Sequence, residues 1–332
     1  MIRTDKSAII ITVLLVALLM FNLTGCGAQQ SQVPEKPEVI NIGYSLRPLN
    51  VPTIVAQEKN MFEQAFAEDG IEVKWHELEG PSTTEALAAG AIDMAVSLNY
   101  VTAIISKASG NQINIISSFA QFPQAIGLLA SKDSGVESVA DLKGKKIAVK
   151  KGTMLQEMLI KALEEAQVKV EDLEVVDMES ANAANAVLLK QVDAAVLPDP
   201  LLMKTLASGE TVLLRNAEDL ILGQSVIAAR SEFLEQYPDL ARKFLQVQKE
   251  AWQWSINNSE EALNLAAEVN NMDLKAVNVL YPKFDFSLEI DQQNVNKLKE
   301  SADFLQANGI IDKEIDTQAL ITDLVDTGYL PK

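Results

Sequence analysis

The chain has 332 residues, of which 48% are hydrophobic and 22% charged, so it is long enough to bury one large core or two smaller ones. It carries 46 acidic against 28 basic side chains, a formal net charge of −18, which argues against nucleic acid or an anionic lipid surface as a partner. A small anionic ligand is not excluded, because the field of a local site can override the net charge of the protein.

The N-terminal end has the pattern of a signal peptide. A basic start is followed by an apolar stretch over residues 8–21, which is shorter than the roughly 20 residues that a helix needs to span a bilayer. The sequence LTGC at residues 23–26 resembles the lipobox of bacterial lipoproteins, in which the signal is cut before the cysteine and the cysteine is acylated. We therefore predict a signal peptide over residues 1–25 and lipidation of Cys26. An ordinary signal peptide with an incidental cysteine is the alternative.

Residues 26–38 are largely polar and contain proline, which predicts a tether without a core of its own. Because stable membrane anchoring takes more than one lipid signal, a multiply acylated Cys26 would hold the protein at a membrane surface. The folded part is expected to begin near Val39 and to function outside the cytoplasm.

From Val39 onward, strand patterns alternate with helix patterns. Strands are predicted at residues 39–44, 71–77, 92–96, 113–119, 125–130, within 139–151, at 173–177 and at 192–197. Helices are predicted at residues 52–66, 82–89, 99–108, after Gly152-Thr153, and at 231–258, 259–270, 273–280, 291–307 and 317–326, with a helix start at Pro238. This alternation predicts an α/β protein whose mostly parallel sheets are covered by helices on both faces.

Two segments 100 positions apart share one pattern. EALAAGAIDMAVSLN at residues 85–99 and NAVLLKQVDAAVLPDP at 185–200 both run from a helix end into a short buried strand, with Asp93 matching Asp193. The repeat predicts two similar α/β units, each presenting a polar loop at the carboxyl end of a strand, where open sheets bind ligands. Chance similarity is the alternative, because Ala, Val and Asp are common in such segments. No linker separates the units, so the crossings are predicted at residues 122–126 and 222–226.

The residues needed for catalysis are scarce. The single histidine, His76, lies within a predicted strand between Trp75 and Glu77, and we interpret it as a strand residue without a special role. One histidine and one lipidated cysteine cannot form a His/Cys metal cluster or a Ser-His-Asp or Cys-His set. No phosphate-binding or dinucleotide-binding glycine run is present in the sequence, and no short motif indicates a carboxylate pair for glycoside chemistry. We therefore predict no catalytic residue, metal or cofactor.

Residues suited to anion binding are better represented. At Gly80-Pro81-Ser82, at Ser97 and Asn99, and at Gly152-Thr153, the chain passes from a strand into a helix through small or hydroxyl side chains. Helix N-termini carry unpaired N–H groups and a positive dipole end, so several that converge make an anion site. One such end contributes at most about 2 kcal/mol, whereas a micromolar ligand needs roughly 8 kcal/mol. Several donors must therefore converge, and Arg47 could add a bidentate bond.

Capping is the alternative interpretation of the same residues. Ser82 with Glu85, and Thr153 with Gln156, have the spacing of a capping box, and Asp199 precedes Pro200 at a helix start.

Several segments together resemble one family. They are residues 44–62, EALAAGAIDMAV, ADLKGKKIAVKKGTMLQ, VDAAVLPDP, and the helical run from SEFLEQYPDL to NSEEAL. Over about residues 39–270 they resemble the extracytoplasmic solute-binding proteins of nitrate, sulfonate and taurine ABC transporters. The resemblance implies a two-lobed type II periplasmic-binding fold with a hinge of two crossing strands. It also implies a monomer that closes over a ligand and delivers it to a membrane permease. Lobe 1 is expected at residues 39–123 and 225–332, and lobe 2 at 124–224.

The resemblance also implies a set of ligand-binding positions. They are Ser45, Leu46, Arg47, Gly80, Pro81, Ser82, Ser97, Asn99, Gly152, Thr153 and Asp199. Many sulfonate and nitrate binders have an aromatic residue on each side of an acidic-Pro pair where this chain has Leu197-Pro198-Asp199-Pro200-Leu201. This chain keeps the acidic residue but has neither aromatic residue. Asp199 is therefore expected either to contact an ammonium group of the ligand or only to cap its helix.

We expect a small oxyanion as the ligand, with alkanesulfonates or taurine first. The alternatives are a binder of a flat heterocycle such as a pyrimidine or thiamine precursor, an enzyme on the same fold, and a sensing or adhesion lipoprotein without a transporter.

Overall fold

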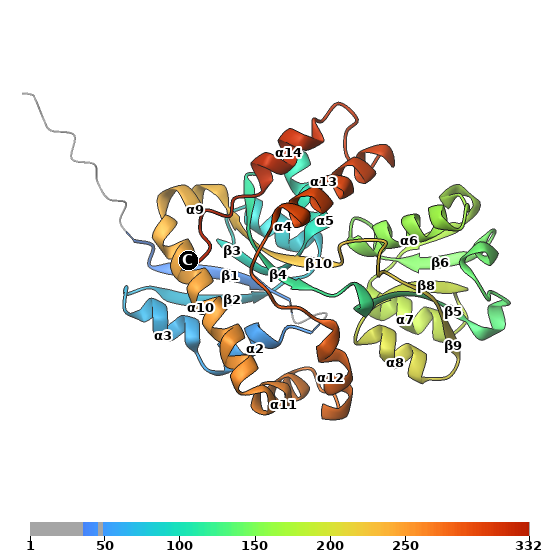
Figure 1. Ribbon diagram of the computed structural model, residues 1–332, viewed down its shortest axis with the longest axis horizontal. Helices are drawn as coiled ribbons and strands as arrows, with labels where there is room; N and C mark the ends of the chain where they lie inside the picture. The colour runs from blue at the N-terminus through green and yellow to red at the C-terminus, as the bar shows by residue number, and fades with distance from the viewer. Residues whose placement is uncertain (1–35, 46–48, 332) are drawn as a thin grey trace, which may run out of the picture. The chain divides into compact units, whose positions relative to one another are not determined.

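The computed structural model describes residues 36–45 and 49–331, which contain two five-stranded sheets (Figure 1). The predicted signal peptide and Cys26 lie outside the described residues, as do Leu46 and Arg47. Within the described ranges, no helix combines the length and the apolar character that crossing a membrane requires.

The first sheet is built mostly from the N-terminal part of the chain. Its strands are β1 (Val39–Tyr44), β2 (Glu72–Glu77), β3 (Met94–Asn99), β4 (Ile113–Gln121) and β10 (Gln224–Arg230), in the order β2-β1-β3-β10-β4. β1 pairs in parallel with β2 and β3, whereas β10 is antiparallel to both of its neighbours. All residues of β3 except Asn99 are buried, as expected for a central strand covered on both faces.

The second sheet repeats this arrangement. Its strands are β5 (Ile126–Ser131), β6 (Lys146–Val149), β7 (Glu174–Asp177), β8 (Ala194–Pro198) and β9 (Thr211–Asn216), in the order β7-β6-β8-β5-β9, with β5 as the reversed strand. The prediction of an α/β fold with mostly parallel sheets is confirmed. β9 was not predicted, because it is an edge strand that leaves Val212 and Leu213 exposed and therefore lacks a clear apolar face.

The repeated aspartates occupy equivalent places in the two sheets. Asp93 Oδ2 accepts a hydrogen bond from Asn41 N at 2.9 Å, and Asp193 Oδ2 accepts one from Lys146 N at 2.8 Å. In each sheet the aspartate thus joins its strand to the neighbouring parallel strand. The sequence repeat therefore corresponds to a repeat in structure.

Helices cover both sheets. They are α2 (Val51–Glu58), α3 (Met61–Ala67), α4 (Pro81–Ala88), α5 (Tyr100–Ala108), α6 (Met154–Glu165), α7 (Ser180–Leu188), α8 (Leu201–Ala207), α9 (Ser231–Gln236), α10 (Pro238–Asn257), α11 (Ser259–Val269), α12 (Leu274–Leu280), α13 (Gln292–Ala307) and α14 (Thr317–Leu324). In Figure 1, α6 lies on one face of the second sheet and α7 and α8 on the other. On the first sheet, α10 and α11 pack against α2, and α13 and α14 against α5.

Two predicted helices are each divided in two. Residues 52–66 form α2 and α3, with Lys59 and Asn60 between them. Residues 231–258 form α9 and α10, which are separated at Tyr237. Pro238 is the first residue of α10, as predicted, because proline lacks the N–H that a helix interior needs.

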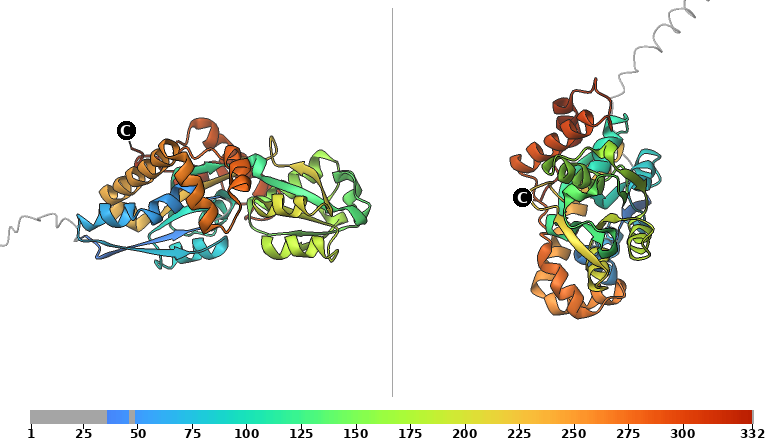
Figure 2. Two further views of the ribbon diagram at one scale, coloured as in Figure 1. Left: turned by 90° about the horizontal axis from the view of Figure 1, so that it is seen from below. Right: turned by 90° about the vertical axis from the view of Figure 1, so that its right-hand side faces the viewer.

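The chain passes between the sheets twice, at residues 122–125 and 217–223 (Figures 1 and 2). The first crossing contains a 3-10 turn over Pro123–Ala125. The two crossings are in contact, since Phe122 N donates to Gly223 O at 2.7 Å. Gly223 has φ +57°, and a Cβ atom there would lie 2.7 Å from Pro123 Cα. Glycine is therefore required where the two crossings meet.

Candidate functional site

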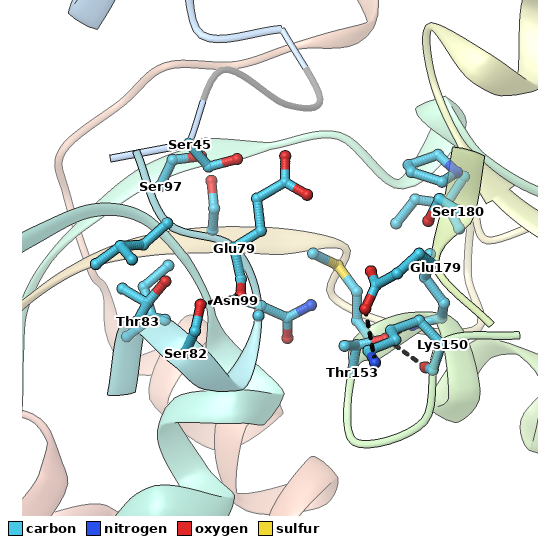
Figure 3. A pocket seen from close by; sticks show the side chains of 18 of the residues that line it. Ser45, Glu79, Ser82, Thr83, Ser97, Asn99, Lys150, Thr153, Glu179 and Ser180 are labelled. Carbon is cyan, nitrogen blue, oxygen red and sulfur yellow. Dashed lines mark hydrogen bonds and ion pairs between the residues drawn. The ribbon is translucent and has the colours of Figure 1, made fainter. Parts of the chain in front are cut away.

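A cavity of about 480 Å³ lies at the carboxyl ends of strands from both sheets. Of the predicted ligand-binding residues, it is lined by Ser45, Gly80, Ser82, Ser97, Asn99 and Thr153, most of which are labelled in Figure 3. Pro81 and Gly152 are adjacent to lining residues but do not line the cavity themselves, and Asp199 lies elsewhere. The volume is that of a small-molecule site.

Two helices that meet the cavity have no side-chain cap. The N-cap residue of α4 is Gly80, which has no side chain to accept a hydrogen bond. The N-cap residue of α7 is Glu179, whose side chain accepts none from its helix. The predicted capping box at Ser82 is wrong, because the Ser82 hydroxyl donates to Glu79 O at 2.8 Å. Among the described residues, no acceptor bonds the N–H groups of Ser82, Ser180 or Ala181.

These two helix ends come from opposite sheets. α4 precedes β3 and α7 precedes β8, so they are the equivalent helices of the structural repeat. Both line the cavity with their first turns. Free N–H groups and two positive dipole ends therefore face one cavity, which favours an anion there.

Two other helix ends at the cavity are capped by their own residues. Asn99 Oδ1 accepts from Val101 N at 3.0 Å at the start of α5, and Thr153 Oγ1 accepts from Leu155 N at 3.2 Å at the start of α6. The capping interpretation of Thr153 is confirmed, although Gln156 Oε1 bonds Gly152 N instead of completing the predicted box. The Asn99 amide extends into the cavity (Figure 3), where its NH₂ group is a donor without a partner among the described residues.

A bulge places Ser97 at the cavity wall. Ser97 has φ +64°, which is uncommon for a residue with a side chain, and the pairing of β3 with β10 shifts register beside it. Bulges next to a site re-aim a side chain. On the neighbouring strand β10, Ser225, which pairs with Asn99, also lines the cavity and is only 2% exposed; its hydroxyl has no partner among the described residues. Ser225 was missed because it lies in an apolar strand pattern.

Charged side chains also line the cavity. In the described part of the chain they are Glu77, Glu79, Glu179 and Lys150. Lys150 Nζ lies 2.8 Å from Glu179 Oε1, and this hydrogen bond raises the pKa of Lys150, against the smaller opposite effect of burial. Lys150 therefore stays positively charged at the cavity (Figure 3). Sequence reasoning missed it, although it lies in the KKGT segment beside Thr153.

Both carboxylate oxygens of Asp199 are bonded to other residues of the protein. Its side chain is buried, Oδ1 accepts from Met203 N at 2.9 Å, and Oδ2 lies 2.7 Å from Lys283 Nζ. Burial raises the pKa of Asp199, although Lys283 acts in the opposite direction. The carboxylate bonds the first turn of α8 and not the cavity, so the capping alternative describes it better than contact with a ligand.

Replacing Asp199 by Asn is expected to leave ligand affinity within about twofold of the original, because the residue lies outside the cavity. Because its native pKa is raised, the contribution of Asp199 to stability is greatest below the unfolded-state pKa of about 3.9 and is lost as the pH rises through the native value. The free energy of unfolding of the original chain, measured in urea, should therefore exceed that of Asp199→Asn by more at about pH 4 than at about pH 7. A large loss of affinity would instead show that Asp199 contributes to ligand binding.

The strand order, the single reversed strand in each sheet and the cavity at the strand ends define a periplasmic-binding-protein fold. The chain belongs to the NMT1/THI5-like family, whose sequence model matches residues 48–262. The resemblance and the fold predicted from the sequence are thus confirmed.

Similar proteins include a Bacillus subtilis protein described as an aliphatic sulfonates-binding protein, which is 33% identical over 96% of this chain and 95% of that protein. An Escherichia coli protein with the same description is 25% identical over 94% of this chain and 96% of its own length. The alkanesulfonate-binding protein SsuA from Xanthomonas axonopodis pv. citri, bound to MOPS, superposes with a TM-score of 0.79 at 23% identity, covering 88% of this chain and 99% of that one. These relatives are binding proteins and not enzymes, in agreement with the prediction of a non-enzyme.

Proposed function

We propose that this protein is the solute-binding component of an ABC importer, and that it captures a small oxyanion such as an alkanesulfonate or taurine. The observation that carries the proposal is the pair of uncapped helix ends, α4 from one sheet and α7 from the other, at a single cavity. A sulfonate group offers three acceptor oxygens to such N–H donors. The names of the relatives from Bacillus subtilis and Escherichia coli support the same ligand class.

Binding would follow from bending at the two crossings. Lobe 1 (residues 39–123 and 225–332) and lobe 2 (124–224) each supply one uncapped helix end. The ligand would first bind the donors of one lobe, and closure would add those of the other. Ser97, Asn99 and Ser225 supply side-chain donors from lobe 1. The closed form would dock on the permease as a monomer.

The protein would work outside the cytoplasm, with acylated Cys26 as its membrane anchor and residues 26–38 as the tether. Mass spectrometry of the mature protein tests this part separately. A diacylglycerol adduct on an N-terminal Cys26 is expected, and a mature chain that still carries residues 1–25 would contradict it.

Calorimetry with ethanesulfonate, taurine, nitrate and a pyrimidine tests the ligand class. We expect ethanesulfonate or taurine to bind with a dissociation constant of about 1 μM or lower, since converging charged and neutral donors are available. Binding of the pyrimidine alone would establish the heterocycle alternative, and turnover of any of these compounds would establish an enzyme.

Replacing Ser97 by Gly is expected to weaken ethanesulfonate binding by about tenfold, or about 1.4 kcal/mol, because a cavity donor is lost. The free energy of unfolding should not fall, because glycine adopts the positive φ of this position without the cost of about 1–2 kcal/mol that other residues incur. Calorimetry and urea unfolding of the same variant measure both effects. Unchanged affinity would show that Ser97 does not contribute to ligand binding. A clear loss of stability would contradict backbone strain at the positive φ of Ser97.

A further inference from the structure

A buried cluster outside the cavity connects the two sheets. At its centre, Glu157 on α6 has a fully buried side chain. Its Oε2 accepts a hydrogen bond from the Tyr100 hydroxyl at 2.5 Å, and its Oε1 accepts one from the Ser301 hydroxyl at 2.7 Å. Lys161 Nζ lies 2.9 Å from the same Oε1. None of these four residues lines the cavity.

The cluster joins helices that begin at the cavity. Tyr100 is the first residue of α5, which follows β3, whereas Glu157 lies in the first turns of α6, which follows β6 of the other sheet. A second bond in the same place runs from the Thr102 hydroxyl to Gly152 O at 3.1 Å. The N-cap residues of these two helices, Asn99 and Thr153, both line the cavity. The cluster therefore bridges two cavity walls that belong to different sheets.

The central hydrogen bond, from Tyr100 to Glu157, is short and buried. Burial, and then the neighbouring Glu157 carboxylate, raise the pKa of Tyr100 well above its ordinary value, against weaker opposite effects of Ser301 and the Leu222 backbone. The raised pKa keeps the phenol protonated at neutral pH, so the Tyr100 hydroxyl remains a donor to Glu157. A hydrogen bond to a charged group shielded from water contributes more than a neutral one. Leu222, in the second crossing at residues 217–223, lines a pocket together with Lys161 and Ser301 of the cluster.

We propose that Glu157 and Tyr100 are positioning residues for ligand binding. They act as a fixed pivot that holds the starts of α5 and α6 at the spacing the ligand requires while the crossings bend. A pivot of this kind lowers the ordering cost of binding, because the cavity walls are already placed. The proposal relies on the proposed function only for the class of ligand used as a probe.

Tyr100→Phe in the full chain, held in a non-ionic detergent, tests the proposal. The variant keeps the buried ring and removes only the hydroxyl. Ser255→Ala is the matched control, since Ser255 is also buried and its hydroxyl bonds Ala251 O at 2.7 Å within a single helix, α10. Glu157→Gln is a second variant that keeps an acceptor but removes the charge. Urea unfolding, calorimetry with ethanesulfonate, and hydrogen exchange at the first turns of α5 and α6 are the measurements.

We expect Tyr100→Phe to raise the dissociation constant for ethanesulfonate by about tenfold. Glu157→Gln should have an effect of the same sign, and Ser255→Ala should leave affinity unchanged at a comparable loss of stability. Exchange should increase at both helix starts in Tyr100→Phe. Unchanged or tighter binding in Tyr100→Phe would overturn the proposal. If the original chain binds no oxyanion, the proposed function fails and hydrogen exchange alone decides: an increase at both helix starts supports the pivot, and an increase at one or neither overturns it.

Discussion

Asp93→Ala is expected to lower the free energy of unfolding by about 3 kcal/mol, because it breaks a mostly buried ion pair as well as a bond between strands. Asp93 Oδ1 lies 2.7 Å from Arg230 Nη2, and the two side chains are only 11% and 21% exposed. Its Oδ2 accepts from Asn41 N on β1. The substitution leaves the Arg230 charge with exposed Glu232 as its remaining partner and leaves an unpaired N–H in the sheet.

The structural repeat supplies a control for Asp93→Ala. Asp193 accepts the equivalent bond from Lys146 N but forms no ion pair among the described residues. Asp193→Ala should therefore cost only about 1–2 kcal/mol, the effect of one lost acceptor. Urea unfolding of both variants measures the difference. An equal or larger loss in Asp193→Ala would contradict the role given to the Arg230 pair.

Gly223→Ala is expected to cost about 3–4 kcal/mol, the sum of a positive φ and a clash with backbone atoms. The new Cβ would lie 2.7 Å from Pro123 Cα and 2.9 Å from Pro123 N, neither of which a side-chain rotation can move. Because this is where the two crossings meet, ethanesulfonate binding should weaken as well.

Gly144→Ala separates the two parts of this cost. Gly144 has φ +76° but nothing within 4 Å of the added Cβ, so only the backbone cost of about 1–2 kcal/mol should appear. Urea unfolding and calorimetry compare the two variants. Equal losses of stability would show that the contact between the crossings adds nothing.

Most of the fold could be predicted because local patterns and packing agree. The strands β1, β3 and β8 are rich in apolar residues, and the repeat around Asp93 and Asp193 predicts two similar sheets. The edge strand β9 could not be predicted, because its exposed residues depend on which strand lies beside it. The division between α9 and α10 was marked by Pro238, but Tyr237 as the break depends on packing.

The site was predicted less completely than the fold. Strand-to-helix turns located Gly80, Ser97, Asn99 and Thr153 correctly at one cavity. Sequence spacing could not distinguish a capping serine from a free helix end, and the capping box at Ser82 was predicted wrongly for that reason. Which carboxylates remain available also depends on partners distant in sequence. Glu157 and its partner Ser301, 144 positions apart, illustrate this.

The most direct test of the account is a crystal structure of the protein with ethanesulfonate. We expect the sulfonate oxygens to lie about 2.7–3.2 Å from N–H groups of α4 and α7, Ser82 on one side and Ser180 or Ala181 on the other. A ligand bound away from these two helix ends, or held by one sheet alone in a closed structure, would contradict it.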